Sequence, residues 1–251
     1  MQSCVKAQLR DISRLCYTRP VKFRKLYKGL LIRRYKRFLA DVELAGGEVV
    51  TAHCANPGSM LRCAPADAPV WLSRSDNPKR KLPFTWELVR AHGSYVCVNT
   101  ARANGVVADA LHAGVVAELA GFDELRREVA YGERSRVDIL LERGDDKTYV
   151  EVKSVTLPMG KRVSAFPDSV TARGTRHLRQ LMAMVDEGHR AVMLFCCARA
   201  DTARVRPADE IDPVYGQTLR EAADHGVELL AYRCDINTRG MWLRERVPIE
   251  L

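Results

Sequence analysis

The segment from Arg136 to Val155 constrains the fold more than any other part of this chain. Apolar and polar residues alternate on both sides of a turn signal at Gly144-Asp145-Asp146, which predicts two β-strands joined as a hairpin. Because side chains on a strand alternate between faces, Glu151 and Lys153 share one face of the second strand, about 7 Å apart. If the two strands pair antiparallel, Asp138 of the first strand can join them on that face.

Two carboxylates and an ammonium group among branched apolar residues point to a cation site. Buried charges need a partner or a metal, and two carboxylates repel each other unless a cation lies between them. Oxygen ligands suit a hard divalent cation such as Mg²⁺, held by Asp138 and Glu151. Lys153 could orient or deprotonate a water, or neutralise charge on a phosphate. The same spacing also fits a surface hairpin with a solvent-exposed Glu–Lys pair, and the spacing alone leaves both interpretations open.

A third acid comes from the segment before the hairpin. The pattern predicts a helix over residues 106–120, capped by Asn104 and ended by Gly121. Leu111 and Glu118 fall on one stripe of this helix, so Glu118 would point toward the surface that buries Leu111. It is a candidate third acid for the metal site. A glutamate at the edge of the core, paired with an arginine, fits the spacing equally well.

The charge of the chain is concentrated in its N-terminal part. The net charge is +9, but residues 1–100 hold 18 Lys and Arg against 7 Asp and Glu, giving +11, whereas residues 101–251 hold 22 against 24, giving −2. This asymmetry predicts a polyanionic partner, most simply nucleic acid and in particular DNA. A membrane surface and a basic surface that serves solubility are the alternatives, although no long helix with a clean apolar face accompanies the charge.

The region from residue 21 to about residue 100 reads as a small β-barrel. Short runs with period-two alternation and turns between them predict five or six strands, at residues 29–34, 38–44, 48–52, 69–73, 85–89 and 95–98. A strip of basic and aromatic side chains is typical of surfaces that bind phosphates and stack bases. Its members are Arg33, Arg34, Tyr35, Lys36 and Arg37, followed by Phe38. Trp71 and Trp86 are predicted to lie in the core.

Two loops of this region are candidate contacts for an anion. Asn56-Pro57-Gly58-Ser59 is a strong turn signal whose backbone amides could face an anion. A second loop carries three consecutive cations, Lys79, Arg80 and Lys81.

The remainder of the chain predicts an α/β domain with a mixed sheet. A helix is expected over residues 171–187 and buried strands at 191–197 and 227–232. Asp212 should cap another helix that ends at Gly226. On the first of these helices a polar cluster could reach phosphate or could be solvated; it consists of Arg173, Arg176, His177 and Gln180.

Other features favour a cytoplasmic protein. No run of eighteen apolar residues exists, so we expect no transmembrane span, and the N-terminus lacks the pattern of a secretory signal. The eight cysteines contain no Cys-x-x-Cys pair, and we expect them to be reduced. His53, Cys54 and Cys63 lack structural-zinc spacing. Residues 1–20 are predicted to be a disordered or loosely helical extension.

Several ordered motifs resemble those of the sugar fermentation stimulation protein A family, from about Lys28 onward. They are Arg34–Val42, Asn56–Gly58, Val98–Thr100, Ser135–Asp138, Tyr149–Leu157, Phe166–Asp168 and Arg173–Leu178. The acid–acid–lysine set with its helices also resembles the core of the PD-(D/E)XK nuclease superfamily. The resemblance implies an OB-like barrel at residues 21–100 and a nuclease-like α/β domain at 101–251.

The family is described as DNA-binding and linked to regulation of sugar (maltose) metabolism. The resemblance therefore implies phosphodiester hydrolysis with Mg²⁺ or Mn²⁺. In this interpretation Asp138, Glu151 and the carbonyl of Val152 would hold the metal, Lys153 would position the attacking water, and Glu118 would complete the site. Arg173, Arg176 and Gln180 would hold the flanking backbone. The alternatives are a DNA-binding regulator that does not use the site and, more weakly, an RNA-processing factor.

Overall fold

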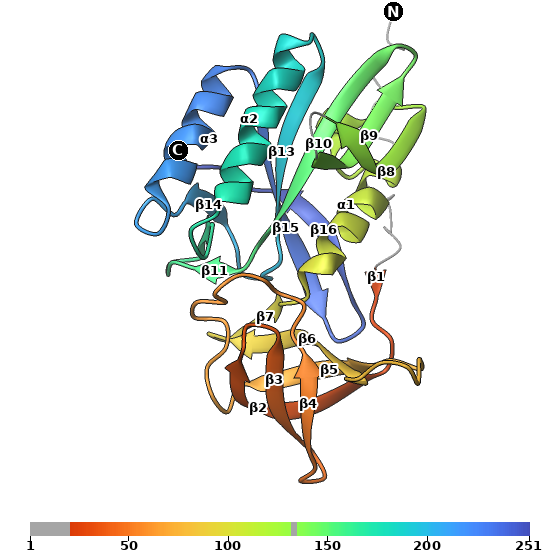
Figure 1. The fold of residues 1–251 in the computed structure, drawn as a ribbon, viewed down its shortest axis with the longest axis vertical. Helices are drawn as coiled ribbons and strands as arrows, with labels where there is room; N and C mark the ends of the chain where they lie inside the picture. Colours follow the sequence, from red (N-terminus) through yellow and green to blue (C-terminus); the bar gives the residue numbers. More distant parts are fainter. Residues whose placement is uncertain (1–20, 132–134) are drawn as a thin grey trace, which may run out of the picture.

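A closed five-stranded β-barrel forms the N-terminal unit of the computed structural model, which describes residues 21–131 and 135–251 (Figure 1). The strands pair in the order β4-β3-β2-β5-β6, and a parallel β4–β6 pairing closes the ring. They are β2 (Leu26–Tyr35), β3 (Leu39–Leu44), β4 (Val49–His53), β5 (Pro69–Arg74) and β6 (Phe84–Ala91), with β7 (Ser94–Cys97) added beyond β6. The predicted strands and the barrel are thus confirmed.

Apolar side chains from the alternating strand patterns fill the barrel. Leu31, Val42, Leu72 and Trp86 are fully buried inside it. Trp71 is also buried, but it packs in a core that the barrel shares with the second unit. The barrel strands start at Leu26 rather than at residue 21, because the first two described residues pair elsewhere. The predicted extension, residues 1–20, lies outside the described residues.

A seven-stranded mixed sheet organises the second unit within the described ranges. Its order is β1-β16-β15-β13-β10-β9-β8, parallel between β10, β13 and β15 and antiparallel elsewhere. The strands are β1 (Val21–Lys22), β8 (Glu124–Tyr131), β9 (Ser135–Arg143), β10 (Asp146–Val155), β13 (Arg190–Cys197), β15 (Glu228–Asn237) and β16 (Gly240–Arg246). A smaller sheet contains β11 (Leu157–Pro158), β12 (Val163–Phe166) and β14 (Arg204–Pro207). The predicted β9–β10 hairpin is confirmed, whereas β1, β16 and the smaller sheet were not predicted.

Helices cover both faces of the large sheet. α2 (Ala172–Asp186) and α3 (Pro213–Asp224) lie side by side on one face, and α1 (Ala103–His112) packs on the other (Figure 1). Thr171 caps α2 by accepting from the amide of Gly174, and Asp212 caps α3 by accepting from that of Tyr215. Among the described residues no helix is long and apolar enough to cross a membrane.

The helix predicted over residues 106–120 is the main error of the sequence analysis. A 3₁₀ turn, η1 (Thr100–Arg102), leads into α1, which ends at His112. The stop signal is Gly114, which adopts a left-handed φ of 69°. The chain then runs through a second 3₁₀ turn, η2 (Ala117–Leu119).

Several polar contacts join the barrel to the sheet unit, and two of them involve the carboxylates of Glu87 and Asp168. Glu87 of β6 is 1% exposed and accepts hydrogen bonds from Ser73, Asn99 and Arg102, with the shortest Arg102 contact at 2.7 Å. Farther along the junction, Asp168 accepts a 2.8 Å bond from the amide of Met60. A buried carboxylate that is fully hydrogen-bonded fixes the geometry of the groups around it.

Replacing Glu87 by glutamine should lower the free energy of unfolding by about 2 to 4 kcal/mol, because Arg102 loses its partly buried counter-charge. Guanidinium chloride unfolding curves measure this change. The matched control is Glu210→Gln, which removes an exposed ion pair with Arg206 and should change the stability by less than about 1 kcal/mol. Equal losses in the two variants would contradict a special role for the Glu87 junction.

Candidate functional site

The site forms where β9 and β10 separate. Their pairing ends at Ile139 and Val150; beyond this point β9 pairs with β8 and β10 with β13. Asp138 lies in the resulting fork, where its Oδ2 accepts a 2.8 Å bond from the amide of Val152. Its Oδ1 accepts a 2.7 Å bond from Asn104 of α1. The carboxylate therefore satisfies an amide that the parted strand leaves free.

Glu151 is the centre of a hydrogen-bond chain on β10 and α2. Its side chain is 2% exposed, and Oε1 accepts a 2.5 Å bond from Lys153 Nζ. The same oxygen contacts Nδ1 of His177, whose Nε2 lies 3.2 Å from the donor Nε of Arg173. A proton on Nδ1 would let the imidazole donate to Glu151 while Nε2 accepts from Arg173, and Lys153 Nζ also lies 3.2 Å from Nδ1.

The pKa values of the two carboxyl groups are shifted in opposite directions. Burial, and next the charge of Glu151, raise the pKa of Asp138. Burial also opposes ionisation of Glu151, but the hydrogen bond from His177 and the charge of Lys153 outweigh it, so the pKa of Glu151 lies below its ordinary value. The charge of Glu151 therefore acts on Asp138 across the fork, although Asp138 contacts Asn104 of α1 and Glu151 contacts His177 of α2.

Four buried polar atoms near these carboxylates have no hydrogen-bond partner within the described ranges. They are Glu151 Oε2, Tyr131 Oη, Gln180 Oε1 and Tyr215 Oη. Burial, and next the charge of Glu151, raise the pKa of both tyrosines, so each phenol keeps its proton. The orphaned oxygen of Glu151 is the acceptor that a cation or a donor group would satisfy.

Glu118 does not join this site. It lies in η2, where its Oε2 accepts a 2.6 Å bond from Tyr232 and its Oε1 forms a 2.9 Å ion pair with Arg246. Because α1 ends at His112, Glu118 does not lie on the predicted apolar face of a helix. The alternative of an edge glutamate paired with an arginine is the one observed. The side chain that α1 presents to Asp138 is Asn104, which was predicted as a helix cap.

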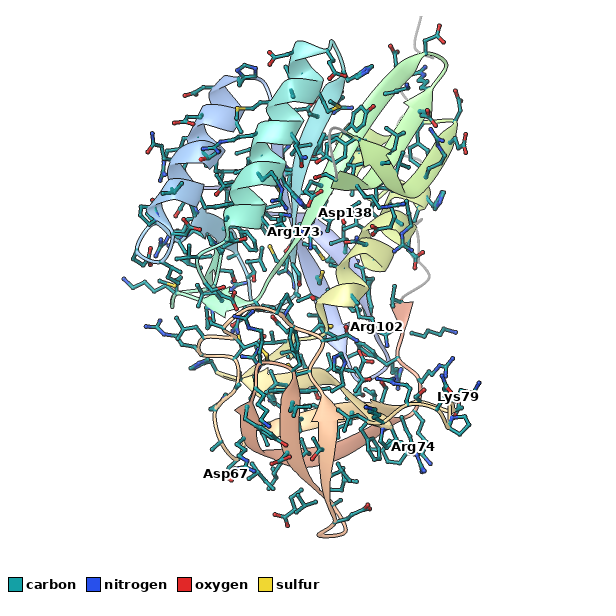
Figure 2. All side chains as sticks on the ribbon, viewed as in Figure 1. Asp67, Arg74, Lys79, Arg102, Asp138 and Arg173 are labelled. Carbon is teal, nitrogen blue, oxygen red and sulfur yellow. The ribbon has the colours of Figure 1, made fainter. Side chains whose placement is uncertain are left out.

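Arginines from α2 border two cavities. The first, here called the arginine cavity, has a volume of about 510 Å³ and is lined by Ser135, Arg136, Arg173, Arg176 and His177, with Glu128 and Ala130. Gln180 lies beside it and donates a 2.6 Å bond to the hydroxyl of Ser135. The second, the interdomain cavity, has a volume of about 390 Å³ and contains Arg173 together with Arg37 of the barrel. Arg173 thus lines both cavities, and Figure 2 labels it near the middle of the molecule.

Some cations of the basic strip are held by hydrogen bonds within the barrel, and others are exposed to solvent. Arg34 donates to the carbonyls of Asn56, Gly58 and Ser59, so it holds the loop that was predicted to face an anion. That loop does meet an anion, the Asp168 carboxylate at the amide of Met60. Arg34 therefore has a structural role in holding this loop, and its assignment as a nucleic-acid contact stays a prediction.

The other members of the strip surround the β2–β3 turn. Arg33 pairs with Asp41 at 2.9 Å and stacks on Tyr35, whose hydroxyl also donates to Asp41. Lys36 and Arg37 form the exposed tip of the turn. Both side chains are exposed, and Arg37 also lines the interdomain cavity.

The loop with Lys79, Arg80 and Lys81 lies elsewhere. Figure 2 shows Lys79 at the side of the barrel, away from Asp138 and Arg173. Arg80 donates a 3.1 Å bond to the hydroxyl of Thr85. The structure therefore does not bring this loop together with the acid cluster.

Sequence reasoning missed three contributors to the site. His177 was placed in a polar cluster that could reach phosphate or be solvated, and not beside Glu151. It follows Arg173 by four residues and shares its helix face, which is a usable signal. Asn104 and Tyr131 reach the acids only through the tertiary fold, and no local pattern indicates this.

Comparison with known proteins agrees with the two units. Residues 32–98 match the family described as "SfsA N-terminal OB domain", and residues 101–240 match "Sugar fermentation stimulation protein RE domain". Relatives from Pseudomonas aeruginosa (strain LESB58) and Geotalea uraniireducens (strain Rf4) are 57% and 53% identical, each match covering 90% of this chain and 97% of the relative. Both are named sugar fermentation stimulation protein homologs. The chain belongs to the sugar fermentation stimulation protein family. This membership and the OB-type barrel confirm the resemblance that the motifs carried.

A solved structure of the same family has a similar fold. The chain matches Pyrococcus furiosus SfsA, described in complex with Ca²⁺, with a TM-score of 0.83 and 24% identity, covering 92% of this chain and 98% of that one. At this identity the match shows the shared arrangement of barrel and sheet unit.

Replacing His177 by alanine should raise the pKa of Glu151, because the carboxylate loses a donor that favours its charged form. A lowered pKa stabilises the fold above the unfolded value of about 4.3 and loses that contribution as pH falls through the folded pKa. The variant should therefore also be less stable at neutral pH. Titration of ¹³C-labelled glutamate carboxyl groups by NMR measures the shift.

His225→Ala is the control for this measurement, because His225 bonds Asp186 at the protein surface. It should leave the Glu151 titration unchanged. An unaltered Glu151 pKa in His177→Ala would show that the imidazole does not hold this carboxylate.

Proposed function

We propose that this member of the sugar fermentation stimulation protein family binds DNA and hydrolyses its phosphodiester bonds with the help of a divalent cation. The observation that carries the proposal is the cluster of Asp138, Glu151 and Lys153, with Glu151 Oε2 buried and lacking a partner in the described ranges. Binding alone does not require two repelling carboxylates at one place. Their retention beside a lysine fits chemistry on a phosphate.

The donor set fits Mg²⁺ or Mn²⁺. No group of three or more His, Cys, Asp or Glu side chains arranged to hold a metal occurs in the described part of the chain. Two carboxylates, the Val152 carbonyl and water would complete an oxygen shell, which is how Mg²⁺ is often bound. The raised pKa of Asp138 supports this, because a cation between the acids would relieve their repulsion. The Pyrococcus furiosus relative is described in complex with Ca²⁺, and Ca²⁺ is also a hard cation that prefers oxygen ligands.

A bound Mg²⁺ would polarise the scissile phosphate and lower the pKa of a coordinated water. The chain's own groups would prepare the reaction. Lys153, held against Glu151, would orient the attacking water or stabilise charge on the phosphate. His177 would hold Glu151 ionised. Arg173, reaching the His177 ring and both cavities, would fix the phosphate backbone.

DNA would lie along the interdomain and arginine cavities. Arg37 and Lys36 come from the barrel, and Arg173 and Arg176 come from α2. Contacts of this kind release counterions, so binding should weaken steeply with salt. The family name refers to stimulation of sugar fermentation. We propose that DNA binding by this protein serves the regulation of sugar (maltose) metabolism.

A second candidate is a DNA-binding transcriptional regulator that does not use the acid cluster. Asp138 is already satisfied by Val152 and Asn104, and Glu151 Oε1 by Lys153 and His177. The cluster is thus held together by protein groups alone, which a regulator would also allow.

Cleavage measurements separate the two candidates. Asp138→Asn and Lys153→Met should each lower the rate of DNA cleavage by at least about 100-fold, because the first weakens the cation site and the second removes the group beside the water. The assay compares single- and double-stranded DNA and RNA with Mg²⁺, Mn²⁺ or chelator. Glu118→Gln is the matched control and should cleave at the wild-type rate, because Glu118 lies outside the site. Cleavage that survives both test substitutions would come from a contaminant, and absence of cleavage on every substrate would favour the regulator.

Binding tests the DNA path independently of catalysis. Arg37→Glu should weaken DNA binding about tenfold or more and lower the slope of log K against log salt by about one, because one phosphate contact is lost. Fluorescence anisotropy at several salt concentrations measures both quantities. Arg143→Glu, an equal change of charge in the exposed β9–β10 turn, is the control. An equal loss in both variants would mean that only the net charge matters.

A further inference from the structure

A third cavity lies between the barrel and the small sheet, apart from the acid cluster. It has a volume of about 350 Å³, and we call it the Arg199 cavity. Its charged lining residues are Arg62 and His92 of the barrel with Lys161, Arg162, Arg199 and Asp201 of the second unit. It shares no lining residue with the arginine or interdomain cavities. The proposed nuclease function therefore does not account for it.

Arg199 is the unusual member of this wall. Its side chain is 2% exposed, and its Nη2 donates a 2.8 Å bond to Asp201. Its Nη1 is buried without a hydrogen-bond partner among residues 21–131 and 135–251. A guanidinium group is always charged, so a buried donor without an acceptor is unfavourable until an acceptor arrives.

Asp201 presents the complementary feature. Its Oδ2 receives Arg199, but its Oδ1 is buried with no donor in the described ranges. An acceptor that lacks a donor therefore stands next to a donor that lacks an acceptor. A ligand with an acceptor oxygen and a hydroxyl group could satisfy both atoms.

The other charges at the cavity favour an anion. Arg62, Lys161 and Arg162 are exposed cations, while Asp201 is the one carboxylate among the lining residues. The neighbouring thiol adds no negative charge, because burial raises the pKa of Cys63 to about 11 despite the nearby charge of Arg199. The cavity therefore keeps a net positive charge.

The backbone holds two of these cations in an unfavourable conformation. Gly160, Lys161 and Arg162 have φ angles of 81°, 47° and 63° in the turn between β11 and β12. Hairpin turns of this handedness normally use Asn and Gly, because other side chains clash there. Arg162 is fixed by a 3.2 Å bond from its Nε to the carbonyl of Asp201. The turn thus directs two long cationic side chains to the rim of the cavity.

We propose that the Arg199 cavity binds the phosphate group of a small hydroxylated phosphate ester. Arg62, Arg162 and Arg199 would donate to the phosphate oxygens, as arginine does in planar, paired recognition of phosphate. A hydroxyl group of the ester would donate to Asp201 Oδ1. The volume of the cavity suits a small ligand.

Isothermal titration calorimetry of the full chain tests the site with glucose 6-phosphate as the probe. We expect a Kd below about 1 mM for this probe, weaker binding of inorganic phosphate and none of glucose. Arg62→Ala and Arg162→Ala change exposed residues, so they should fold normally and each weaken binding by about tenfold or more. Arg37→Ala, in the interdomain cavity, should leave the affinity unchanged.

Several outcomes would overturn the proposal. Absence of glucose 6-phosphate binding would do so, as would binding that is insensitive to both test variants or equally sensitive to Arg37→Ala. A double-stranded oligonucleotide forms the second arm of the experiment. If Arg162→Ala weakened oligonucleotide binding while the ester did not bind, we would conclude that the cavity binds the nucleic-acid backbone and not a free ester.

Discussion

The bond from the Val152 amide to the Asp138 carboxylate is the interaction on which the site depends. A strand that leaves its partner exposes a row of amides and carbonyls, and each buried one needs a new partner. Here the side chain of the strand left behind supplies it. The fork between β9 and β10 can therefore stay open, and α1 and α2 reach into it with Asn104 and His177. This bond compensates for the strand pairing that is lost next to Glu151.

The same fork explains what the sequence could and could not predict. Local alternation located the hairpin, the face shared by Glu151 and Lys153, and the strands of the barrel, because these depend on a period of two. Asp138 was expected to pair across the hairpin, whereas it lies beyond the last paired residues, Ile139 and Val150, and acts on a backbone amide. Register predicts which residues approach one another but not where a pairing ends.

The misplaced glutamate has a different physical cause. Two glycines follow α1, and both Gly114 and Gly121 adopt positive φ. Gly121 was predicted to end the helix, which extended the predicted apolar stripe to Glu118. Helix propensity is a weak guide over a stretch such as residues 113–120, because packing against the sheet decides where the helix stops. His177 illustrates the opposite case, since its spacing from Arg173 was visible but its partner on β10 was not.

The distribution of net charge was a poor guide to where cations are available. The N-terminal part has the excess, yet Arg34 is bound to loop carbonyls and Arg33 to Asp41. The C-terminal part is nearly balanced in number, and many of its acids are paired on the surface, as in Arg190–Glu228 and Arg220–Asp209. Such pairing leaves its arginines at the cavities in excess of the nearby acids. Local pairing therefore decides which cations are left unpaired, and both units contribute such cations.

Two turns of the same composition place cations at two different cavities. Lys36-Arg37 and Lys161-Arg162 both have positive φ at both residues, a conformation that disfavours long side chains. One turn borders the interdomain cavity and the other borders the Arg199 cavity. The strain costs about 1 kcal/mol or more at each residue, and glycine or asparagine would remove much of it. Backbone stability alone therefore disfavours Lys-Arg at both turns, and each turn places a cation at a cavity.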